Sequence, residues 1–110
     1  MGSLVHFNVR KLAKLHGLRS FVETGTAQGD SLAVAGTVPE FVALHSIEII
    51  PTVAAAARLR FEKDKRVQIW EDDTRHALPL ILKELPEGPA LFWLDAHFPA
   101  AHHGDRKSVV

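Results

Sequence analysis

The chain has 110 residues, and its 13 basic and 13 acidic side chains give a formal net charge of zero at pH 7. This length allows one domain at most, and the balanced charge gives no electrostatic reason to expect nucleic acid or an anionic membrane as a partner. The chain has no cysteine, which excludes disulfides and thiolate metal sites. No apolar run is as long as a signal-peptide core or a membrane span, so we expect a soluble, cytoplasmic protein.

The first half of the chain alternates helix-like and strand-like segments. Apolar residues recur at helical spacing over residues 3–17, which predicts a helix that a glycine ends. Residues 18–23 predict the first strand, and a glycine-containing turn leads from it into a short helix over residues 31–36. Residues 41–49 predict a second strand, whose largely apolar composition is typical of a parallel strand covered on both sides.

The same alternation continues in the second half. Pro51 favours a helix start, and the alanine-rich segment after it predicts a helix that reaches Phe61. Residues 67–70 predict a third strand, residues 75–85 a helix, and residues 90–94 the most uniformly apolar strand of the chain. Strands separated by helices at this spacing predict an α/β fold with a parallel sheet and right-handed connections.

The turn after the first strand is the first candidate for a ligand site. Its pattern, Glu-x-Gly-x-x-x-Gly-x-Ser over residues 23–31, lacks the middle glycine of the dinucleotide-binding pattern. Glycines let the chain bend sharply or let a ligand approach the backbone, and amides at a helix start attract polar or anionic groups. A turn that only joins a strand to a helix is the alternative.

Acidic side chains stand at the end of each predicted strand. Because ligands of open α/β sheets gather at the carboxyl ends of the strands, we expect these acids to share one edge with the glycine turn. The strand-end residues are Glu23, Glu48, Asp72 with Asp73, and Asp95 with His97. Ordinary acids that face water are the alternative for Glu23 and Glu48.

The segment after the fourth strand is rich in histidine. A carboxylate that closes a long apolar strand must find water, a hydrogen-bond partner or a cation, and this applies to Asp95. Asp95, His97, His102, His103 and Asp105 carry oxygen and imidazole groups that suit several divalent ions. Their spacing fits no established zinc signature, so a solvated histidine-rich loop is the alternative.

In order and spacing, these residues resemble the class I S-adenosylmethionine-dependent methyltransferases, in the variant of small-molecule O-methyltransferases of the catechol and macrocin type. Residues 22–31 resemble the first motif of that family, and residues 46–48 resemble the second-strand end, whose acid holds the ribose hydroxyls of the cofactor. Residues 72–74 are similar to the turn beside the adenine, although Asp72 replaces the usual glycine. Residues 92–97 resemble the fourth-strand end, whose aspartate is a metal ligand in metal-dependent members.

The resemblance implies a Rossmann-like, three-layer α/β/α fold with about four parallel strands in the order 3-2-1-4. It implies S-adenosylmethionine as cofactor, with a divalent ion such as Mg²⁺ in the metal-dependent case, and O-methylation of a small molecule without a nucleic-acid or membrane partner. The cofactor-binding residues implied are Glu23, Gly25, Thr26, Gly29, Ser31, Glu48, Asp72, Asp73 and Thr74; the catalytic residues implied are Asp95 and His97, with Asp95 as metal ligand.

The physical roles agree with this resemblance. A carboxylate such as Glu48 at the end of a strand can accept two hydrogen bonds from a ribose diol. Methyl transfer from a sulfonium is a displacement, so proximity and alignment can supply much of the catalysis, with a base or metal activating the acceptor. No serine stands in a nucleophile-elbow context, and the reaction needs no dedicated nucleophile.

Two other functions stay open on the residues alone. One is a module that holds S-adenosylmethionine or another adenosine ligand without turnover, and the other is an enzyme of Rossmann-like fold that uses NAD, since an acid after the second strand also suits a dinucleotide ribose. The chain stops soon after the fourth strand, so we expect residues 1–110 to be a single, partial domain, a fragment of a longer methyltransferase. An apolar fourth strand at an exposed sheet edge would then favour a homodimer.

Overall fold

A computed structural model describes residues 8–27, 29–94 and 108–109 of the chain. In the first half, the elements are α1 (Val9–His16), β1 (Ser20–Thr24), α2 (Asp30–Gly36), β2 (Ala43–Glu48) and α3 (Pro51–Arg60). In the second half, they are β3 (Val67–Glu71), α4 (Thr74–Glu84), β4 (Ala90–Leu94) and the short β5 (Ser108–Val109). Among these helices, none has the length and apolar character that crossing a bilayer requires.

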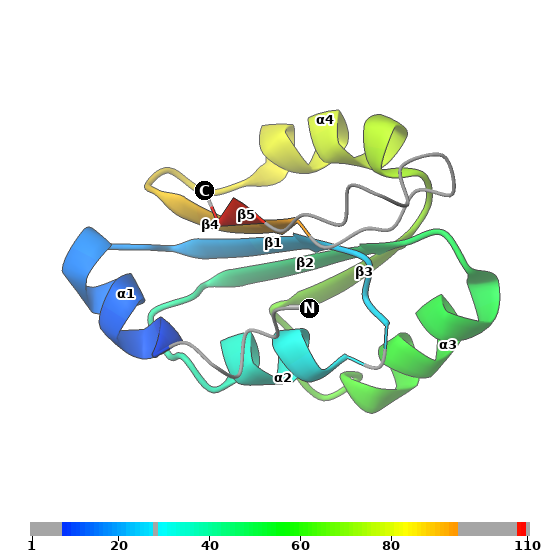
Figure 1. Cartoon of the computed structure of the whole chain (residues 1–110), viewed down its shortest axis with the longest axis horizontal. Helices are drawn as coiled ribbons and strands as arrows, with labels where there is room; N and C mark the ends of the chain where they lie inside the picture. The colour runs from blue at the N-terminus through cyan, green and yellow to red at the C-terminus, as the bar shows by residue number, and fades with distance from the viewer. Residues whose placement is uncertain (1–7, 28, 95–107, 110) are drawn as a thin grey trace.

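The strands form one sheet in the order β3-β2-β1-β4-β5 (Figure 1). The pairs β1–β2, β1–β4 and β2–β3 are all parallel. This confirms the predicted α/β class and the strand order 3-2-1-4.

The fifth strand was not predicted, and it changes the expectation for the sheet edge. It runs antiparallel to β4, with Val109 opposite Trp93 and Ser108 opposite Leu94. The expectation that β4 is an edge strand open to a second copy of the chain is therefore wrong at its carboxyl end. There the ladder hydrogen bonds that would recruit a second chain are made within this one.

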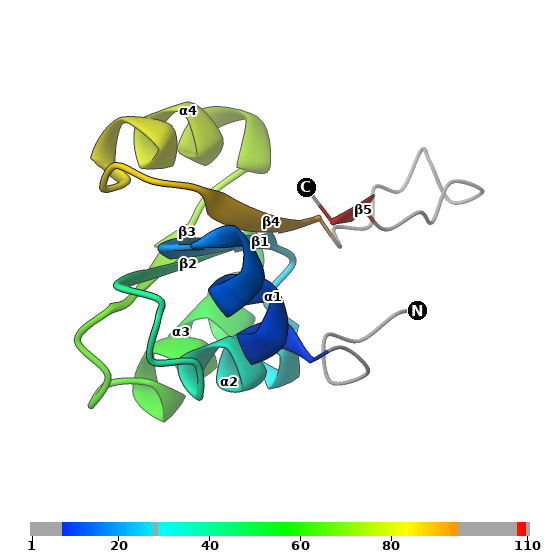
Figure 2. The ribbon, with the colours of Figure 1, turned by 90° about the vertical axis from the view of Figure 1, so that its left-hand side faces the viewer.

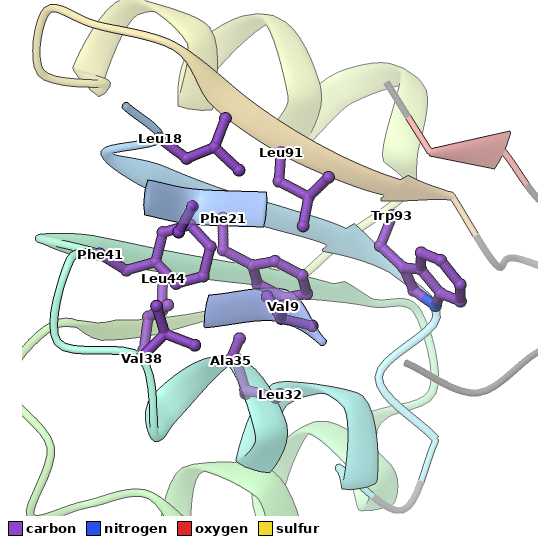
Figure 3. Packing of buried hydrophobic residues seen from close by; sticks show 11 residues of the cluster. Val9, Leu18, Phe21, Leu32, Ala35, Val38, Phe41, Leu44, Leu91 and Trp93 are labelled. Atoms are coloured by element: carbon purple, nitrogen blue, oxygen red, sulfur yellow. The ribbon is translucent and has the colours of Figure 1, made fainter. Parts of the chain in front are cut away.

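Helices cover both faces of the sheet, but unequally. Figure 2 shows α1, α2 and α3 on one face and α4 on the other. The larger core lies on the three-helix face, where Phe21 of β1 and Leu44 of β2 pack toward Leu32 of α2 (Figure 3). The smaller core under α4 is formed by Val22, Ile47, Ala77 and Ile81. Burial of these apolar side chains is the main favourable contribution to folding.

Local signals place the helix ends. The side chain of Asn8 accepts a hydrogen bond from the Lys11 N–H at 3.0 Å, which satisfies a free amide at the start of α1. Gly17 ends that helix in the left-handed conformation, with φ of 63°. Pro51 is the first residue of α3, as the sequence predicts. The predicted helix over residues 3–17 is thus described from Val9, and residues 3–7 lie outside the described part of the chain.

Candidate functional site

The carboxyl ends of β1, β2 and β3 meet at one edge of the sheet, because these strands are parallel neighbours. On the three-helix face, alternate positions of the two inner strands change from apolar to polar as they approach this edge. Phe21 is followed by Glu23 on β1, and Leu44 is followed by Ser46 and Glu48 on β2. All five side chains are buried. Burying a polar group costs free energy unless the group is hydrogen-bonded. Apolar packing alone therefore does not explain the polar side chains at this edge.

A short row of buried oxygen atoms lies under the glycine turn. Ser46 stands opposite Glu23 in the β1–β2 register, and its hydroxyl donates to Glu23 Oε2 at 2.6 Å. The hydroxyls of Ser46 and Thr26 are 2.5 Å apart. Glu23, Thr26 and Ser46 are at most 3% exposed. Glu23 therefore lies beneath the turn, and the alternative of an ordinary strand-end acid facing water is wrong for it.

Glu48 links the end of β2 to the same turn. Its Oε1 accepts the Ala27 N–H at 3.2 Å, and its Oε2 accepts the Ile50 N–H at 3.0 Å. The side chain is 6% exposed, so the alternative of an acid that faces water is wrong here as well. A carboxylate has about four acceptor positions, and these two amides use two of them. Glu48 thus keeps acceptor capacity at the edge where the turn and β2 meet.

The turn itself requires unusual backbone angles. Gly25, Ala27 and Gly29 all have positive φ, at 80°, 51° and 88°. A Cβ atom on Gly29 would lie 3.1 Å from side-chain atoms of both Arg60 and Phe61. The backbone angles of the turn therefore explain why glycine stands at both motif positions. Ala27, in contrast, adopts a conformation that alanine seldom takes. Sequence reasoning missed Ala27, because nothing in its type signals a positive φ.

The end of β3 is arranged around the start of α4. The Asp73 carboxylate accepts the Arg75 N–H at 2.8 Å and so caps the helix, whose first residue is Thr74. Asp72 Oδ2 lies 2.5 Å from His76 Nδ1. This hydrogen bond lowers the pKa of Asp72 and raises the pKa of His76. The amide of Asp72 also donates to the Glu48 carbonyl at 3.1 Å, which joins this segment to the edge.

Apolar surface and a hollow lie beside these polar groups. Ile49 and Ile50, directly after Glu48, are 64% and 51% exposed. A shallow pocket of about 300 Å³ lies between the turn and α3, lined by Ala27, Thr52, Val53, Ala56, Ala57 and Arg60. Neither feature was predicted. The two isoleucines that follow the acidic strand end could have indicated the exposed apolar surface. Ile49 was instead included in the predicted strand.

The predicted site residues are therefore brought together only in part. Glu23, Thr26 and Glu48 converge on the turn, and Gly25 and Gly29 shape it. Ser31 is the second residue of α2 and is half-buried. Asp72, Asp73 and Thr74 form the adjoining β3–α4 junction.

Asp95 and His97 lie outside the described residues, as do His102, His103 and Asp105. In the part of the chain that the structure describes, no group of three or more histidine, cysteine, aspartate or glutamate residues is arranged to hold a metal ion. The assignment of Asp95 as a metal ligand, and of Asp95 and His97 as catalytic, stays a prediction.

Comparison with known proteins gives a likeness in structure only. No family model matches the sequence, and no curated protein matches it. The fold is similar to that in the crystal structure of the 23S rRNA methyltransferase ErmE, with a TM-score of 0.50 and 15% sequence identity. The match covers 79% of this chain and 45% of that chain, so the present chain spans less than half the length of the matched protein.

This likeness corrects the expectation of a small-molecule acceptor and of no nucleic-acid partner, because the matched protein is named as an rRNA methyltransferase. The small-molecule O-methyltransferase type has no support from it either. The expectation of no nucleic-acid partner rested on the net charge, which does not report how basic side chains are distributed. The expectation of a small-molecule acceptor rested on sequence motifs that belong to the fold and do not identify the acceptor. What the comparison establishes is the fold, a Rossmann-like α/β fold similar to that of the matched methyltransferase.

Proposed function

We propose that residues 1–110 form a single, partial domain that binds S-adenosylmethionine as the cofactor-binding part of a methyltransferase. The observation that carries this proposal is the buried carboxylate of Glu48, held at the carboxyl end of β2 by the amides of Ala27 and Ile50. It stands beside the glycine turn in a sheet of order 3-2-1-4, at the edge where open α/β sheets bind ligands.

The residues at this edge fit an adenosine-containing ligand. Glu48 has acceptor positions left for the two hydroxyls of a ribose, and charged acceptors form the stronger hydrogen bonds. The exposed side chain of Ile49 offers apolar surface directly beside it, suited to the flat face of an adenine. The glycine turn at residues 25–27 and 29 would receive the methionine portion, with Gly25 and Gly29 allowing the positive φ angles that its shape requires.

Bound S-adenosylmethionine would supply an activated methyl group. The contribution of this chain is to hold the ribose at Glu48 and the amino-acid end at the turn, so that the methyl group is aligned for displacement. Asp95 and His97 are proposed as catalytic residues on the resemblance at residues 92–97. Unchanged turnover of an Asp95→Ala variant would contradict that role.

RNA is the first acceptor class to assay, because the matched structure is that of a 23S rRNA methyltransferase. The chain would be incubated with methyl-labelled S-adenosylmethionine and ribosomal RNA, and label in the RNA would be counted. Incorporation that Asp95→Ala abolishes would support both the acceptor class and the catalytic assignment. No incorporation by a chain that binds the cofactor would favour the cofactor-binding module without turnover.

The cofactor proposal is tested by calorimetric titration with S-adenosylmethionine and, separately, with NAD. The variants are Glu48→Ala and Glu48→Gln, of which the second keeps the side-chain shape and loses the charge. Glu71→Ala is the matched control, because Glu71 stands opposite Glu48 in the register but is exposed and pairs with Arg58 at 3.4 Å. Circular dichroism would verify that each variant is folded.

We expect the parent chain and Glu71→Ala to bind S-adenosylmethionine equally, and both Glu48 variants to bind at least about tenfold more weakly. A folded parent chain that does not bind S-adenosylmethionine would contradict the proposal. Binding of NAD alone would instead support the dinucleotide alternative.

A further inference from the structure

Strand β2 is connected to the glycine turn at two separate points. Glu48 accepts the main-chain N–H of Ala27, and Ser46, two residues earlier on the same face, contacts the side chain of Thr26. Residues two apart on a strand point to the same side, so both connections come from one face of β2. Ser46 is fully buried, and the sequence pattern gave it no role.

The direction of the hydroxyl row follows from proton counting. The single hydroxyl proton of Ser46 is donated to Glu23 Oε2 at 2.6 Å. Ser46 can then only accept at its contact of 2.5 Å with Thr26, so the Thr26 hydroxyl is the donor. The chain of donation runs from Thr26 in the turn, through Ser46 on β2, to the carboxylate of Glu23 on β1. Both distances are at the short end for hydrogen bonds between oxygen atoms, as expected when a carboxylate is the final acceptor.

We infer that Ser46 is a positioning residue for the ligand, because it fixes Thr26 and through it the shape of the turn at residues 25–27. This inference rests on the proposed function, in which the turn receives the methionine portion and Glu48 receives the ribose. The Glu48–Ala27 hydrogen bond does not involve Ser46. Loss of the hydroxyl row therefore leaves the ribose contact in place and disturbs the contact with the amino-acid end.

The two ends of the ligand can be separated experimentally. S-adenosylmethionine has both ends, whereas 5′-methylthioadenosine keeps the ribose and adenine and lacks the amino-acid end. A residue needed only for stability would change the affinity for both ligands together, or for neither. A residue that positions the turn would change the affinity for S-adenosylmethionine alone.

The variants are Ser46→Ala, Thr26→Val, which keeps the shape of threonine without its hydroxyl, and Thr26→Ser, which keeps the hydroxyl. Ser20→Ala is the matched control, since Ser20 is also fully buried but begins β1 at the opposite end of the sheet. The Ser20 hydroxyl has no hydrogen-bond partner among the described residues. Dissociation constants for both ligands would be measured by calorimetry at a temperature where circular dichroism shows every variant folded.

We expect Ser46→Ala and Thr26→Val to bind S-adenosylmethionine about tenfold more weakly and to bind 5′-methylthioadenosine within about twofold of the parent chain. Thr26→Ser should recover most of the affinity that Thr26→Val loses, and Ser20→Ala should match the parent. An equal loss for the two ligands, or no loss for either, would overturn the role of Ser46. A folded parent chain that binds neither ligand would instead overturn the proposed function on which this role rests.

Discussion

The carboxylate of Glu48 and the main-chain N–H of Ala27 are joined by a hydrogen bond of 3.2 Å, which ties the end of β2 to a turn 21 residues earlier in the chain. Ala27 has a φ of 51°, and the left-handed conformation costs a residue other than glycine about 1–2 kcal/mol. The hydrogen bond that Ala27 donates to Glu48 offsets part of that cost. The shape of the turn therefore depends on the same acid that we propose binds the ribose.

Substitution of Gly29, which precedes α2, and of Gly36, its last residue, should have opposite effects on stability. Gly29→Ala places a Cβ 3.1 Å from Phe61 Cε2 at a φ of 88°, so we expect the free energy of unfolding to fall by about 1–2 kcal/mol. Gly36→Ala should raise it by about 0.5–1 kcal/mol, because alanine is the better helix former and its Cβ would lie 3.8 Å from Asp64. Urea unfolding measures both; equal effects would contradict the described turn.

Stability should depend on the protonation of His45. This side chain is 2% exposed, and its Nδ1 accepts the Trp70 Nε1–H at 3.0 Å. Burial lowers its pKa from 6.5, against an opposing effect of the negative charge of Glu84. The unfolded chain therefore binds the proton more readily, so this contribution to stability is present above about pH 6.5 and is lost as the pH falls below it.

The free energy of unfolding should accordingly decrease as the pH falls from about 7 to about 5. In the His45→Gln variant it should decrease less over the same range. Glutamine keeps an acceptor for Trp70 without a titrating ring. Denaturant unfolding at several pH values measures this difference. Identical pH dependence in the two proteins would show that His45 does not couple to folding.

The pKa of His76, near the start of α4, should be shifted in the opposite direction to that of His45. The hydrogen bond that His76 donates to the Asp72 carboxylate raises the pKa of His76 above 6.5, whereas burial lowers the pKa of His45. Nuclear magnetic resonance of the imidazole rings would report both midpoints in one experiment. We expect Asp72→Asn to bring the His76 midpoint down toward 6.5 and to leave His45 unchanged. A His76 midpoint that Asp72→Asn does not move would contradict the pairing.

Arg66, just before β3, forms hydrogen bonds with the end of α2 and the segment that connects α2 to β2. Arg66 Nη2 donates to the Gly36 carbonyl at 2.7 Å, and Nη1 donates to the carbonyls of Val38 and Phe41 at 3.2 and 3.1 Å. Asp64 holds the guanidinium through its carboxylate, and this contact lowers the pKa of Asp64. Lysine cannot present the same fork of donors, so we expect Arg66→Lys to lower the free energy of unfolding by about 2–3 kcal/mol.

Arg58→Lys is the control for that substitution. Arg58 is exposed and donates hydrogen bonds to the Ile69 carbonyl and the Glu71 carboxylate, at 3.0 and 3.4 Å. Exposed pairs of this kind contribute little, so the change should stay within about 0.5 kcal/mol. Equal losses for the two arginines, measured by urea unfolding, would argue against a specific role of Arg66.

The order of elements could be predicted because each strand segment contains several apolar, β-favouring residues and the segments between the strands have helical spacing. The predicted strand over residues 90–94 coincides with β4, and the predicted strand over residues 41–49 contains β2. The two-residue β5 could not be predicted, because a strand that short has no periodic sequence pattern. It is recognised as a strand only through its pairing with β4.

The candidate site was predictable to the level of the strand-end acids but not to their contacts. Glu23 and Glu48 were named from position, while Ser46 was read as part of an apolar strand. Its role depends on the cross-strand register that places it opposite Glu23, and register is set by the whole sheet rather than by local sequence. The hydrogen bond that Ala27, with its positive φ, donates to Glu48 likewise joins residues distant in sequence.

The most direct test of the central claim is an amide chemical-shift titration of the ¹⁵N-labelled chain with S-adenosylmethionine. Ala27 and Ile50 donate to the two oxygens of Glu48, so a ribose that binds this carboxylate must change the surroundings of both amides. We predict that the amide signals of Ala27 and Ile50 shift among the most strongly and saturate together. A folded spectrum in which these two signals stay unmoved at saturating ligand would contradict the account.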